Sequence, residues 1–366
     1  MEERFEYYMP TRIVSGSGCV QKNASLFRVY GERALIVTGK SSAKNGALSD
    51  VEGVLRGNGQ SYRVYDRIPN NPTVESVTEG ARIARECGAD FVVAIGGGSP
   101  MDAAKAIAML ARQDAKEGLF AHAIGEDVLP MLHIPTTAGT GSEVTQYAII
   151  TNDEKQTKTS IAAKSLFPQV AFLDGEYMKE LPQDIAVNTA LDAMSHAIEG
   201  MLSVRAGVFT DALARESLRL LLGERKALSE GTYTAESRQN LLHGSTLAGM
   251  VIANTGTTAV HGMGYSLTYF HQVPHGRANG LLLPAFLRIC AKQIPQRIEE
   301  IYAAIGMGEE AFSAFVDALL GRRETYQDSL LRAYAEKASL NKNIKNCMVY
   351  FSEEDLYAVL KASLSK

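Results

Sequence analysis

Short apolar runs alternate with amphipathic stretches along the first half of the chain. The strongest runs, which are rich in β-branched residues, lie at 34–38, 61–65, 90–95 and 131–135. Stretches with apolar residues at helical spacing lie between them, near 45–57, 73–87 and 100–113. Strands that alternate with helices in this way are typical of a parallel sheet with helices on both faces. We therefore predict an α/β fold for this half.

The pattern changes near residue 178, where strand-like runs give way to helical spacing. Two more strand-like runs, at 146–151 and 169–174, precede the change. Helical spacing then continues through 181–202 and 208–222, and the sequence SEED at Ser352 is typical of a helix N-terminus. We predict an α/β domain over 1–178 and an all-helical domain over 179–366, with ligands bound in the cleft between them.

Composition excludes several classes of protein. A chain of 366 residues with a net charge of −4 is long enough for two cores and has no excess of positive charge to attract nucleic acid or an anionic membrane. The N-terminus lacks the basic and apolar segments of a signal peptide, and no stretch is suited to crossing a membrane. Four widely spaced cysteines are typical of reduced thiols: Cys19, Cys87, Cys290 and Cys347. We expect a cytoplasmic protein without nucleic-acid or membrane partners.

One carboxylate and three imidazoles are spaced as candidate ligands of a single divalent metal. Asp192 and His196 are four residues apart, so they share one face of a predicted helix. His261 and His275 follow within 239–276, a run of 38 residues without Asp, Glu, Lys or Arg. Buried histidines need polar partners, and a metal is one. One oxygen and three nitrogens suit Fe(II) or Zn(II) better than Mg(II) or Ca(II); the alternative is four unrelated core or surface residues.

Two turns rich in glycine and hydroxyl residues follow predicted strands of the α/β half. The first, GGGS at 96–99, leads into a helix that we expect to begin at Pro100. Glycines permit a close backbone approach and a helix N-terminus favours an anion, so this turn predicts a pyrophosphate site, with a plain tight turn as the alternative. The second turn is IPTTAGTGSEVT at 134–145, and VTGKSS at 37–42 is a third candidate. Such turns at the carboxyl ends of neighbouring strands would form a nucleotide site.

Four motifs, in this order and spacing, resemble those of the iron-containing (group III) alcohol dehydrogenases. They are GGGSPMDAAK at 96–105, IPTTAGTGSEVT at 134–145, DAMSHAIEG at 192–200 and HGMGYSLTYFHQVPHGRANGLLLP at 261–284. The resemblance covers nearly the whole chain, and the last two motifs are highly specific. It implies a Rossmann-like dinucleotide-binding domain, a helical domain that carries the metal, and a homodimer. It also implies four metal ligands: Asp192, His196, His261 and His275.

The resemblance further implies the residues that contact the cofactor. Gly97, Gly98 and Ser99 hold the pyrophosphate, and Asp102 orders their loop. The remaining implied contacts are Thr136, Thr137 and Thr140 in the second turn, Asn71 on the adenosine side, and Lys158 facing the nicotinamide half. For Lys158, a solvated loop charge is the alternative.

Two positions depart from the family pattern. Members that prefer NAD often carry an aspartate where this chain has Gly39. Gly39, with Ser41 and Ser42, therefore resembles the NADP-preferring branch, and we expect NADP(H) rather than NAD(H). Tyr265 stands where many members have a histidine, which leaves Tyr265, His271 or water to exchange the proton. Tyr265 and His271 are thus the candidate catalytic residues.

The reaction that follows from this resemblance is a reversible hydride transfer between NADP(H) and a small primary alcohol or aldehyde. The metal, Fe(II) with Zn(II) as the alternative, would act as a Lewis acid on the substrate oxygen. Two other enzyme classes remain open, a glycerol-dehydrogenase-like zinc enzyme and a dehydroquinate-synthase-like lyase. The non-enzyme alternative is a metal-binding scaffold or filament subunit.

Overall fold

The computed structural model describes residues 6–40 and 44–365, so Ser41 and Ser42 lie outside the described residues. The chain forms two compact units. One unit, which we call the sheet unit, comprises Met9–Leu181 and Thr234–Leu242. The other, the helical unit, comprises Met1–Tyr8, Pro182–Tyr233 and His243–Lys366. The two units therefore exchange short segments, which a single boundary between residues 178 and 179 does not capture.

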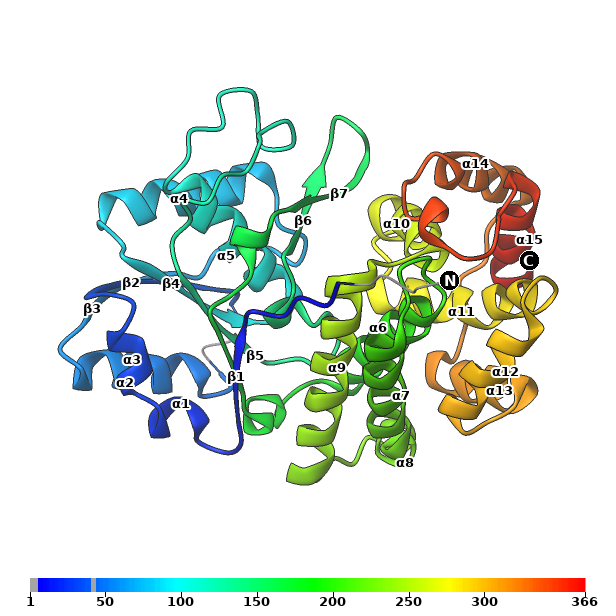
Figure 1. Cartoon of the computed structure of the whole chain (residues 1–366), viewed down its shortest axis with the longest axis horizontal. Coiled ribbons are helices and arrows are strands. Elements are labelled where there is room, and N and C mark those ends of the chain that lie inside the picture. Colours follow the sequence, from blue (N-terminus) through cyan, green and yellow to red (C-terminus); the bar gives the residue numbers. More distant parts are fainter. Residues whose placement is uncertain (1–5, 41–43, 366) are drawn as a thin grey trace. The chain divides into compact units, whose positions relative to one another are not determined.

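A six-stranded parallel sheet forms the centre of the sheet unit (Figure 1). In spatial order its strands are β1 (Arg12–Ser15), β8 (Val170–Leu173), β5 (Met131–Pro135), β4 (Phe91–Gly96), β2 (Arg33–Thr38) and β3 (Ser61–Tyr65). Every residue of the central strands β4 and β5 is buried, as expected for apolar strands covered on both faces. The predicted parallel α/β sheet is confirmed.

Helices cover both faces of this sheet, and alternate side chains of β4 separate the two cores. Val92 and Ala94 pack into the same core as Ile107 of α5. Val93 and Ile95 pack into the opposite core, on the side of α3. Figure 1 shows this arrangement with α4 and α5 above the strands and α1 to α3 below them. The helices are α1 (Cys19–Lys22), α2 (Ser25–Arg28), α3 (Ala47–Gly57), α4 (Val74–Glu86) and α5 (Gly98–Leu110).

A separate antiparallel hairpin consists of β6 (Tyr147–Asn152) and β7 (Thr157–Ala162). The strand expected at 146–151 therefore exists, but it pairs with β7 and not with the parallel sheet. Short 3-10 helices follow three of the strands in this unit: η1 (Ser142–Val144), η2 (Lys164–Leu166) and η3 (Gly175–Met178).

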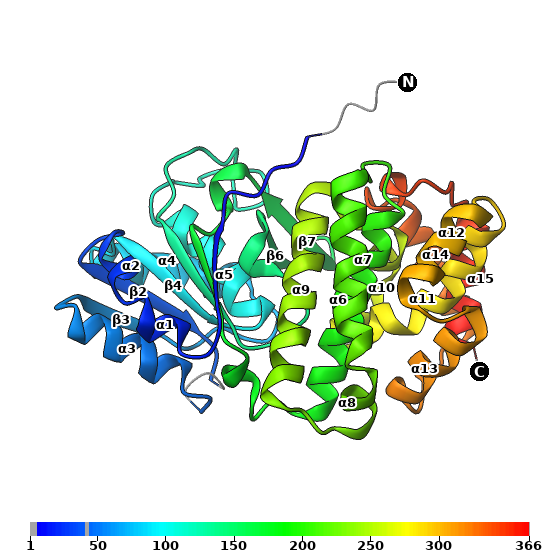
Figure 2. The same ribbon diagram turned by 60° about the horizontal axis from the view of Figure 1, so that its bottom comes forward.

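The helical unit is built around α6, which packs against α7 and α11. Both views show α6 and α7 side by side (Figures 1 and 2). The helices of this unit are α6 (Gln183–Met201), α7 (Val208–Gly223), α8 (Arg225–Glu230), α10 (Ala259–His271), α11 (His275–Ala291), α12 (Pro295–Ile305), α13 (Glu309–Leu320), α14 (Asp328–Ser339), η4 (Ile344–Asn346) and α15 (Glu353–Leu364). A capping box at Ser352 starts α15, as predicted. Helix α9 (Ala235–Thr255) begins in the sheet unit and ends in the helical unit.

Two glycines bring α11 close to α6. A Cβ atom at Gly276 would lie 1.8 Å from the carbonyl oxygen of Asn188, and one at Gly280 would lie 2.9 Å from Leu191. Only glycine permits this approach, which places the start of α11 next to Asp192. Among the described residues, no helix has the length and apolar character needed to span a bilayer.

Candidate metal centre and dinucleotide site

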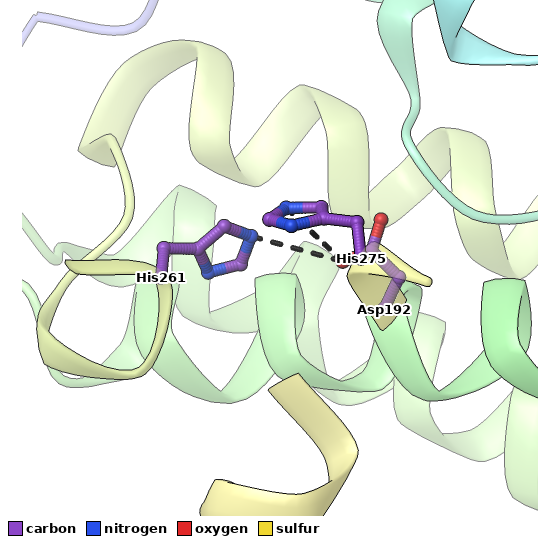
Figure 3. A group of neighbouring side chains, drawn as sticks. All are labelled: Asp192, His261 and His275. Carbon is purple, nitrogen blue, oxygen red and sulfur yellow. Dashed lines mark ion pairs between the residues drawn. The ribbon is translucent and has the colours of Figure 1, made fainter. Parts of the chain in front are cut away.

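The four predicted metal ligands lie together in the helical unit, on three helices. Asp192 and His196 are one turn apart on α6, His261 is in the first turn of α10, and His275 begins α11. Asp192, His261 and His275 each place a ligand atom within 4.8 Å of the others (Figure 3). The Asp192 Oδ1 atom is 3.7 Å from His261 Nε2 and 3.9 Å from His275 Nε2.

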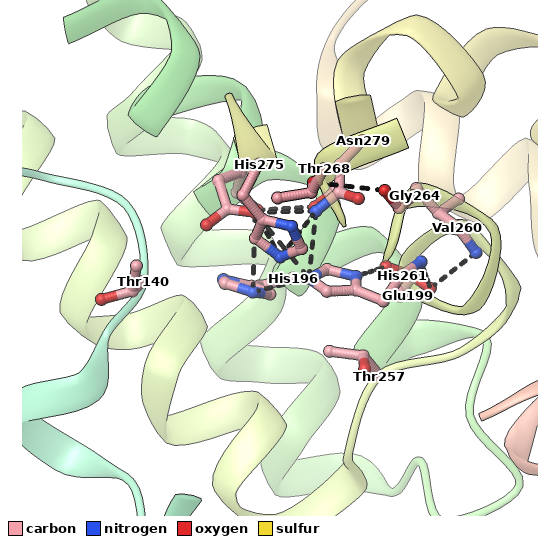
Figure 4. A network of polar contacts seen from close by, with 12 residues as sticks. Thr140, His196, Glu199, Thr257, Val260, His261, Gly264, Thr268, His275 and Asn279 are labelled. Carbon is pink, nitrogen blue, oxygen red and sulfur yellow. Dashed lines mark hydrogen bonds and ion pairs between the residues drawn. The ribbon is translucent and has the colours of Figure 1, made fainter. Parts of the chain in front are cut away.

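His196 completes the cluster. Its Nε2 atom lies 3.0 Å from His261 Nε2 and 3.9 Å from Asp192 Oδ1. Figure 4 shows the two rings side by side, and their centroids are 4.8 Å apart. All four residues that the sequence proposed as ligands are thus neighbours, although up to 83 positions separate them along the chain.

Three of the four candidate ligands are shielded from solvent, and the fourth is partly exposed. Asp192, His196 and His261 are buried, whereas the side chain of His275 is 25% exposed. The ring of Tyr265 stacks on His275, with centroids 5.7 Å apart and planes 14° from parallel. The more accessible side of the cluster is therefore the side of His275 and Tyr265.

The surroundings of Asp192 favour its ionised form. Burial opposes ionisation of Asp192, but the charges of His196, His275 and His261 and a hydrogen bond from Asn279 outweigh it. The pKa of Asp192 consequently lies below its ordinary value. An ionised carboxylate is the form that a metal requires.

Asn279 marks the point on which the ligand atoms converge. Its Nδ2 atom is 2.8 Å from Asp192 Oδ1, 3.1 Å from His261 Nε2 and 3.4 Å from His275 Nε2 (Figure 4). Its buried Oδ1 atom has no hydrogen-bond partner among the described residues. A carboxylate oxygen and imidazole nitrogens that converge on one buried point fit Fe(II) or Zn(II) in donor type.

Two polar residues of this site were not predicted from the sequence. Asn279 lies four residues after His275, so both share one face of α11. Glu199 lies three residues after His196 on α6, fully buried, and its carboxylate contacts His261. Helical spacing from the ligands was the signal that could have identified both.

The second candidate for proton transfer, His271, has other neighbours. It is the exposed last residue of α10. Its Nε2 atom forms a hydrogen bond with the hydroxyl of Tyr334 at 2.7 Å, and its ring lies 4.4 Å from that of Tyr326. These contacts involve none of the four candidate ligands, whereas Tyr265 lies directly beside His275.

In the sheet unit, the two predicted phosphate turns lie against each other. A Cβ atom at Gly97 would come within 3.0 Å of the Thr137 hydroxyl, and one at Gly98 within 2.6 Å of the Thr140 methyl. A side chain at either position would therefore crowd a threonine of the second turn, most closely at Gly98. Helix α5 begins at Gly98, two residues before the expected Pro100, so its N-terminal N–H groups adjoin the turn.

The other implied cofactor contacts surround these turns. Ser99 donates a hydrogen bond to the carbonyl oxygen of Asn70, next to Asn71. The backbone N–H of Thr136 donates to the carbonyl oxygen of Gly96 at 3.0 Å. A side chain at Gly39 would meet only ordinary contacts, at 3.7 Å or more.

Hydrogen bonds of two charged residues of α5, Asp102 and Lys105, link this helix to the second turn and to β6. Asp102 accepts hydrogen bonds from the Ser142 hydroxyl at 2.6 Å and from the Ile149 N–H at 3.1 Å. Lys105, fully buried and not predicted from the sequence, donates to Ser142, to Thr145 and to the Tyr147 carbonyl oxygen. Burial lowers the pKa of Lys105 to about 8, despite the opposing charge of Asp102.

Lys158 lies on strand β7 and not in the preceding turn. It is half-buried. Burial raises the pKa of Asp102 above its ordinary value, and the positive charge of Lys158 partly opposes this rise. The alternative of a solvated loop charge does not match this position.

A parallel α/β unit with two phosphate-type turns, together with helices that group one carboxylate and three imidazoles, is typical of a metal-dependent enzyme that binds a nucleotide cofactor. A family model of iron-containing alcohol dehydrogenases matches residues 10–175, and a model of the C-terminal part of the Fe-containing alcohol dehydrogenase family matches residues 186–363. The chain belongs to the iron-containing alcohol dehydrogenase family. The family is one of alcohol and aldehyde oxidoreductases and implies iron and an NAD(P) cofactor, so neither the lyase nor the scaffold alternative holds.

Individual relatives agree with this placement. Lactaldehyde reductase of Escherichia coli (strain K12) is 35% identical over 300 residues, which are 79% of this chain and 78% of that protein. The crystal structure of an iron-containing alcohol dehydrogenase from Thermotoga maritima has a TM-score of 0.89 and 35% identity, with 99% of both chains covered. A sulfoacetaldehyde reductase from Bifidobacterium kashiwanohense, solved in complex with NAD+, has a TM-score of 0.89 and 28% identity, again with 99% of both chains covered.

Proposed function

We propose that the chain is an NADP(H)-dependent dehydrogenase of small primary alcohols that also reduces the corresponding aldehydes. The observation that carries this proposal is the grouping of four candidate ligands: Asp192, His261 and His275 place ligand atoms within 4.8 Å of one another, and His196 Nε2 lies 3.0 Å from His261 Nε2. These residues would hold the metal, Fe(II) with Zn(II) as the alternative. When bound, the metal supplies Lewis acidity toward the oxygen of the alcohol or aldehyde.

The residues around the ligands would orient the substrate and handle its proton. Tyr265 lies beside the more exposed ligand His275, where its hydroxyl can hydrogen-bond to a substrate. An unperturbed phenol has a pKa of about 10, which is too high for an efficient base at neutral pH. We therefore assign orientation to Tyr265. His271, which is exposed at the end of α10, is the proposed partner for proton exchange with solvent.

The cofactor would bind at the two packed turns of the sheet unit. Gly97, Gly98 and Ser99, at the N-terminus of α5, would receive the pyrophosphate. Thr136, Thr137, Thr140, Asn71 and Lys158 are the further proposed contacts. Gly39 supports NADP(H) because no carboxylate stands there to repel a 2′-phosphate.

One experiment tests the activity, the metal and the cofactor together. The protein is purified without oxygen, its metal content is determined, and a panel of small aldehydes is assayed with NADPH and with NADH. We expect stoichiometric iron or zinc and faster reduction with NADPH. Protein that holds metal and dinucleotide yet reduces no aldehyde and oxidises no alcohol would overturn the proposed function.

We also propose that the protein is a cytoplasmic homodimer. Val204, Val208 and Phe209 are 59%, 63% and 55% exposed and lie close together in the chain, at and before the start of α7. Exposed apolar groups of this kind favour contact with another protein surface. The four free cysteines support a reducing compartment. Light scattering coupled to gel filtration tests the dimer.

A further inference from the structure

Glu199 is a fully buried carboxylate at the N-terminus of α10. Its Oε1 atom accepts hydrogen bonds from the Thr258 N–H at 2.8 Å, the Thr258 hydroxyl at 2.8 Å and the Val260 N–H at 3.1 Å. The His261 N–H lies at 3.4 Å from the same oxygen. These backbone donors belong to the start of a helix and cannot rotate away, so the position of Oε1 must be filled by an acceptor.

The second oxygen of Glu199 is directed at the imidazole of His261. Oε2 contacts His261 Nδ1, while His261 Nε2 faces His196 and Asp192 (Figure 4). An ionised carboxylate only accepts hydrogen bonds, so Nδ1 of His261 must carry the proton. The lone pair of the neutral ring then lies on Nε2, the atom that faces the other ligands.

We propose that Glu199 is a positioning residue that fixes the tautomer and orientation of His261 and thereby sets the metal affinity of the cluster. The inference rests on the proposed metal-dependent function, because it assigns a role to a residue behind a ligand. A carboxylate that accepts from the far nitrogen of a histidine ligand also raises the basicity of the near nitrogen. Glu199 reaches His261 from α6, the helix that carries Asp192 and His196, so one helix holds three of the four ligands in place.

Glu199→Gln is the informative variant because it keeps the shape of the side chain and removes one acceptor. The N–H groups of Thr258 and Val260 require an oxygen acceptor, so in E199Q the amide NH2 is left facing His261 Nδ1. Nδ1 must then accept a hydrogen bond, and the proton moves to Nε2, where it blocks metal binding. We expect Zn(II) and Co(II) to bind about 10- to 100-fold more weakly, measured by competition with a chelator on the full chain.

Two matched variants test whether weaker metal binding in E199Q comes from the changed His261 tautomer or only from a lost hydrogen bond or a lost negative charge. Thr258→Val removes a donor to Oε1 but leaves Oε2 and the His261 tautomer unchanged. Asp184→Asn removes an exposed carboxylate from the first turn of the same helix. We expect both to bind Zn(II) with nearly wild-type affinity. Circular dichroism and thermal unfolding of all variants establish that they are folded.

Nitrogen-15 NMR of histidine-labelled wild-type protein decides the proposal even if E199Q does not fold. Without added metal, and at a pH high enough for its ring to be neutral, His261 should carry its proton on Nδ1; in E199Q it should carry it on Nε2. Comparison with His261→Asn assigns its signals. Wild-type Zn(II) affinity in folded E199Q, or a wild-type His261 protonated on Nε2, would overturn the role of Glu199. Wild-type protein that binds metal but turns over no alcohol would instead refute the proposed function and leave this inference standing.

Discussion

Gly39 is the residue at which cofactor choice is most directly testable. A side chain there has room, because its Cβ atom would come no closer than 3.7 Å to the Ile68 carbonyl oxygen. An aspartate would repel a 2′-phosphate, and like charges placed together in a binding site cost several kcal/mol. We expect wild type to prefer NADPH and Gly39→Asp to shift preference toward NADH, as measured by kcat/KM with both cofactors. A wild-type preference for NADH would refute the interpretation of Gly39.

Substitution of Tyr265 tests whether this residue orients the substrate or donates the proton. If its hydroxyl orients the substrate, Tyr265→Phe loses one uncharged hydrogen bond, and kcat/KM falls roughly tenfold or less. Tyr265→His, which restores the commoner family residue, should remain active. A fall of several orders of magnitude in Tyr265→Phe, with metal and cofactor still bound, would instead identify Tyr265 as the proton donor.

Lys105 predicts a pH dependence of stability. Its folded-state pKa of about 8 is below the ordinary 10.5, so between these pH values the unfolded chain binds more protons than the folded chain. The contribution of Lys105 to the free energy of unfolding therefore rises with pH across this window, by at most about 1.4 kcal/mol per pH unit. Urea unfolding of wild type and Lys105→Met should diverge in favour of wild type as pH rises. Parallel pH curves would contradict the assignment.

At the scale of elements, the contact between α6 and α11 holds the candidate metal ligands together. A Cβ atom at Gly276 would overlap the Asn188 carbonyl oxygen and approach Asp192 Cβ to 2.9 Å, and a backbone atom cannot rotate aside. We expect Gly276→Ala to lower the free energy of unfolding by about 1–3 kcal/mol, the usual cost of overpacking, and to weaken metal binding.

Gly223→Ala is the matched control for this substitution. Gly223 ends α7, and a Cβ atom there would meet nothing within 4 Å. Alanine favours a helix over glycine by roughly 0.5–1 kcal/mol, so this variant should be as stable as wild type or slightly more stable. Equal urea midpoints for Gly276→Ala and wild type would show that α11 can move away from α6 without loss.

The elements also show which parts of the fold the sequence could predict. β3 and β5 have the predicted bounds because β-branched and apolar runs mark them clearly. β1 was missed because it is a four-residue edge strand with no buried residue, and β7 because its residues are mostly polar and half-buried. The parallel sheet was predictable because apolar runs mark its central strands. The β6–β7 hairpin was not, although only residues 153–156 separate its two strands, because β7 has no apolar run to mark it.

Some site residues could likewise be predicted from the sequence, and others could not. The four candidate ligands could be grouped from the sequence because helical spacing and an uncharged segment mark them. Spacing three residues after His196 could have placed Glu199 on the same side of the helix, but its hydrogen-bond donors near residue 260 could not be read from the sequence. Lys105 was missed because the sequence around an isolated lysine in an apolar helix does not indicate its partners. The hydrogen bonds of both residues depend on contacts that only the folded chain supplies.

At the scale of the whole molecule, the proposed metal and cofactor sites belong to different units. His261→Ala and His275→Ala should therefore each abolish metal retention and activity while leaving dinucleotide binding largely intact. Metal analysis, aldehyde reduction and titration with NADPH followed by fluorescence measure the three properties. Full metal stoichiometry in both variants would refute the ligand assignment, and loss of NADPH binding would refute the independence of the two sites.

The exchange of segments between the units constrains how the chain matures on the ribosome. Gln239 accepts a hydrogen bond from the Gly175 N–H at 3.0 Å and donates one to the Ser15 hydroxyl at 3.1 Å, and Arg238 pairs with Glu176. These residues complete the sheet unit, yet they are synthesised after Pro182–Tyr233 of the helical unit. A nascent chain that stops at residue 181 therefore lacks part of its own nucleotide-type unit. Residues up to 242 must be synthesised before the sheet unit has all its segments. The sheet unit therefore cannot finish folding before much of the helical unit has been synthesised.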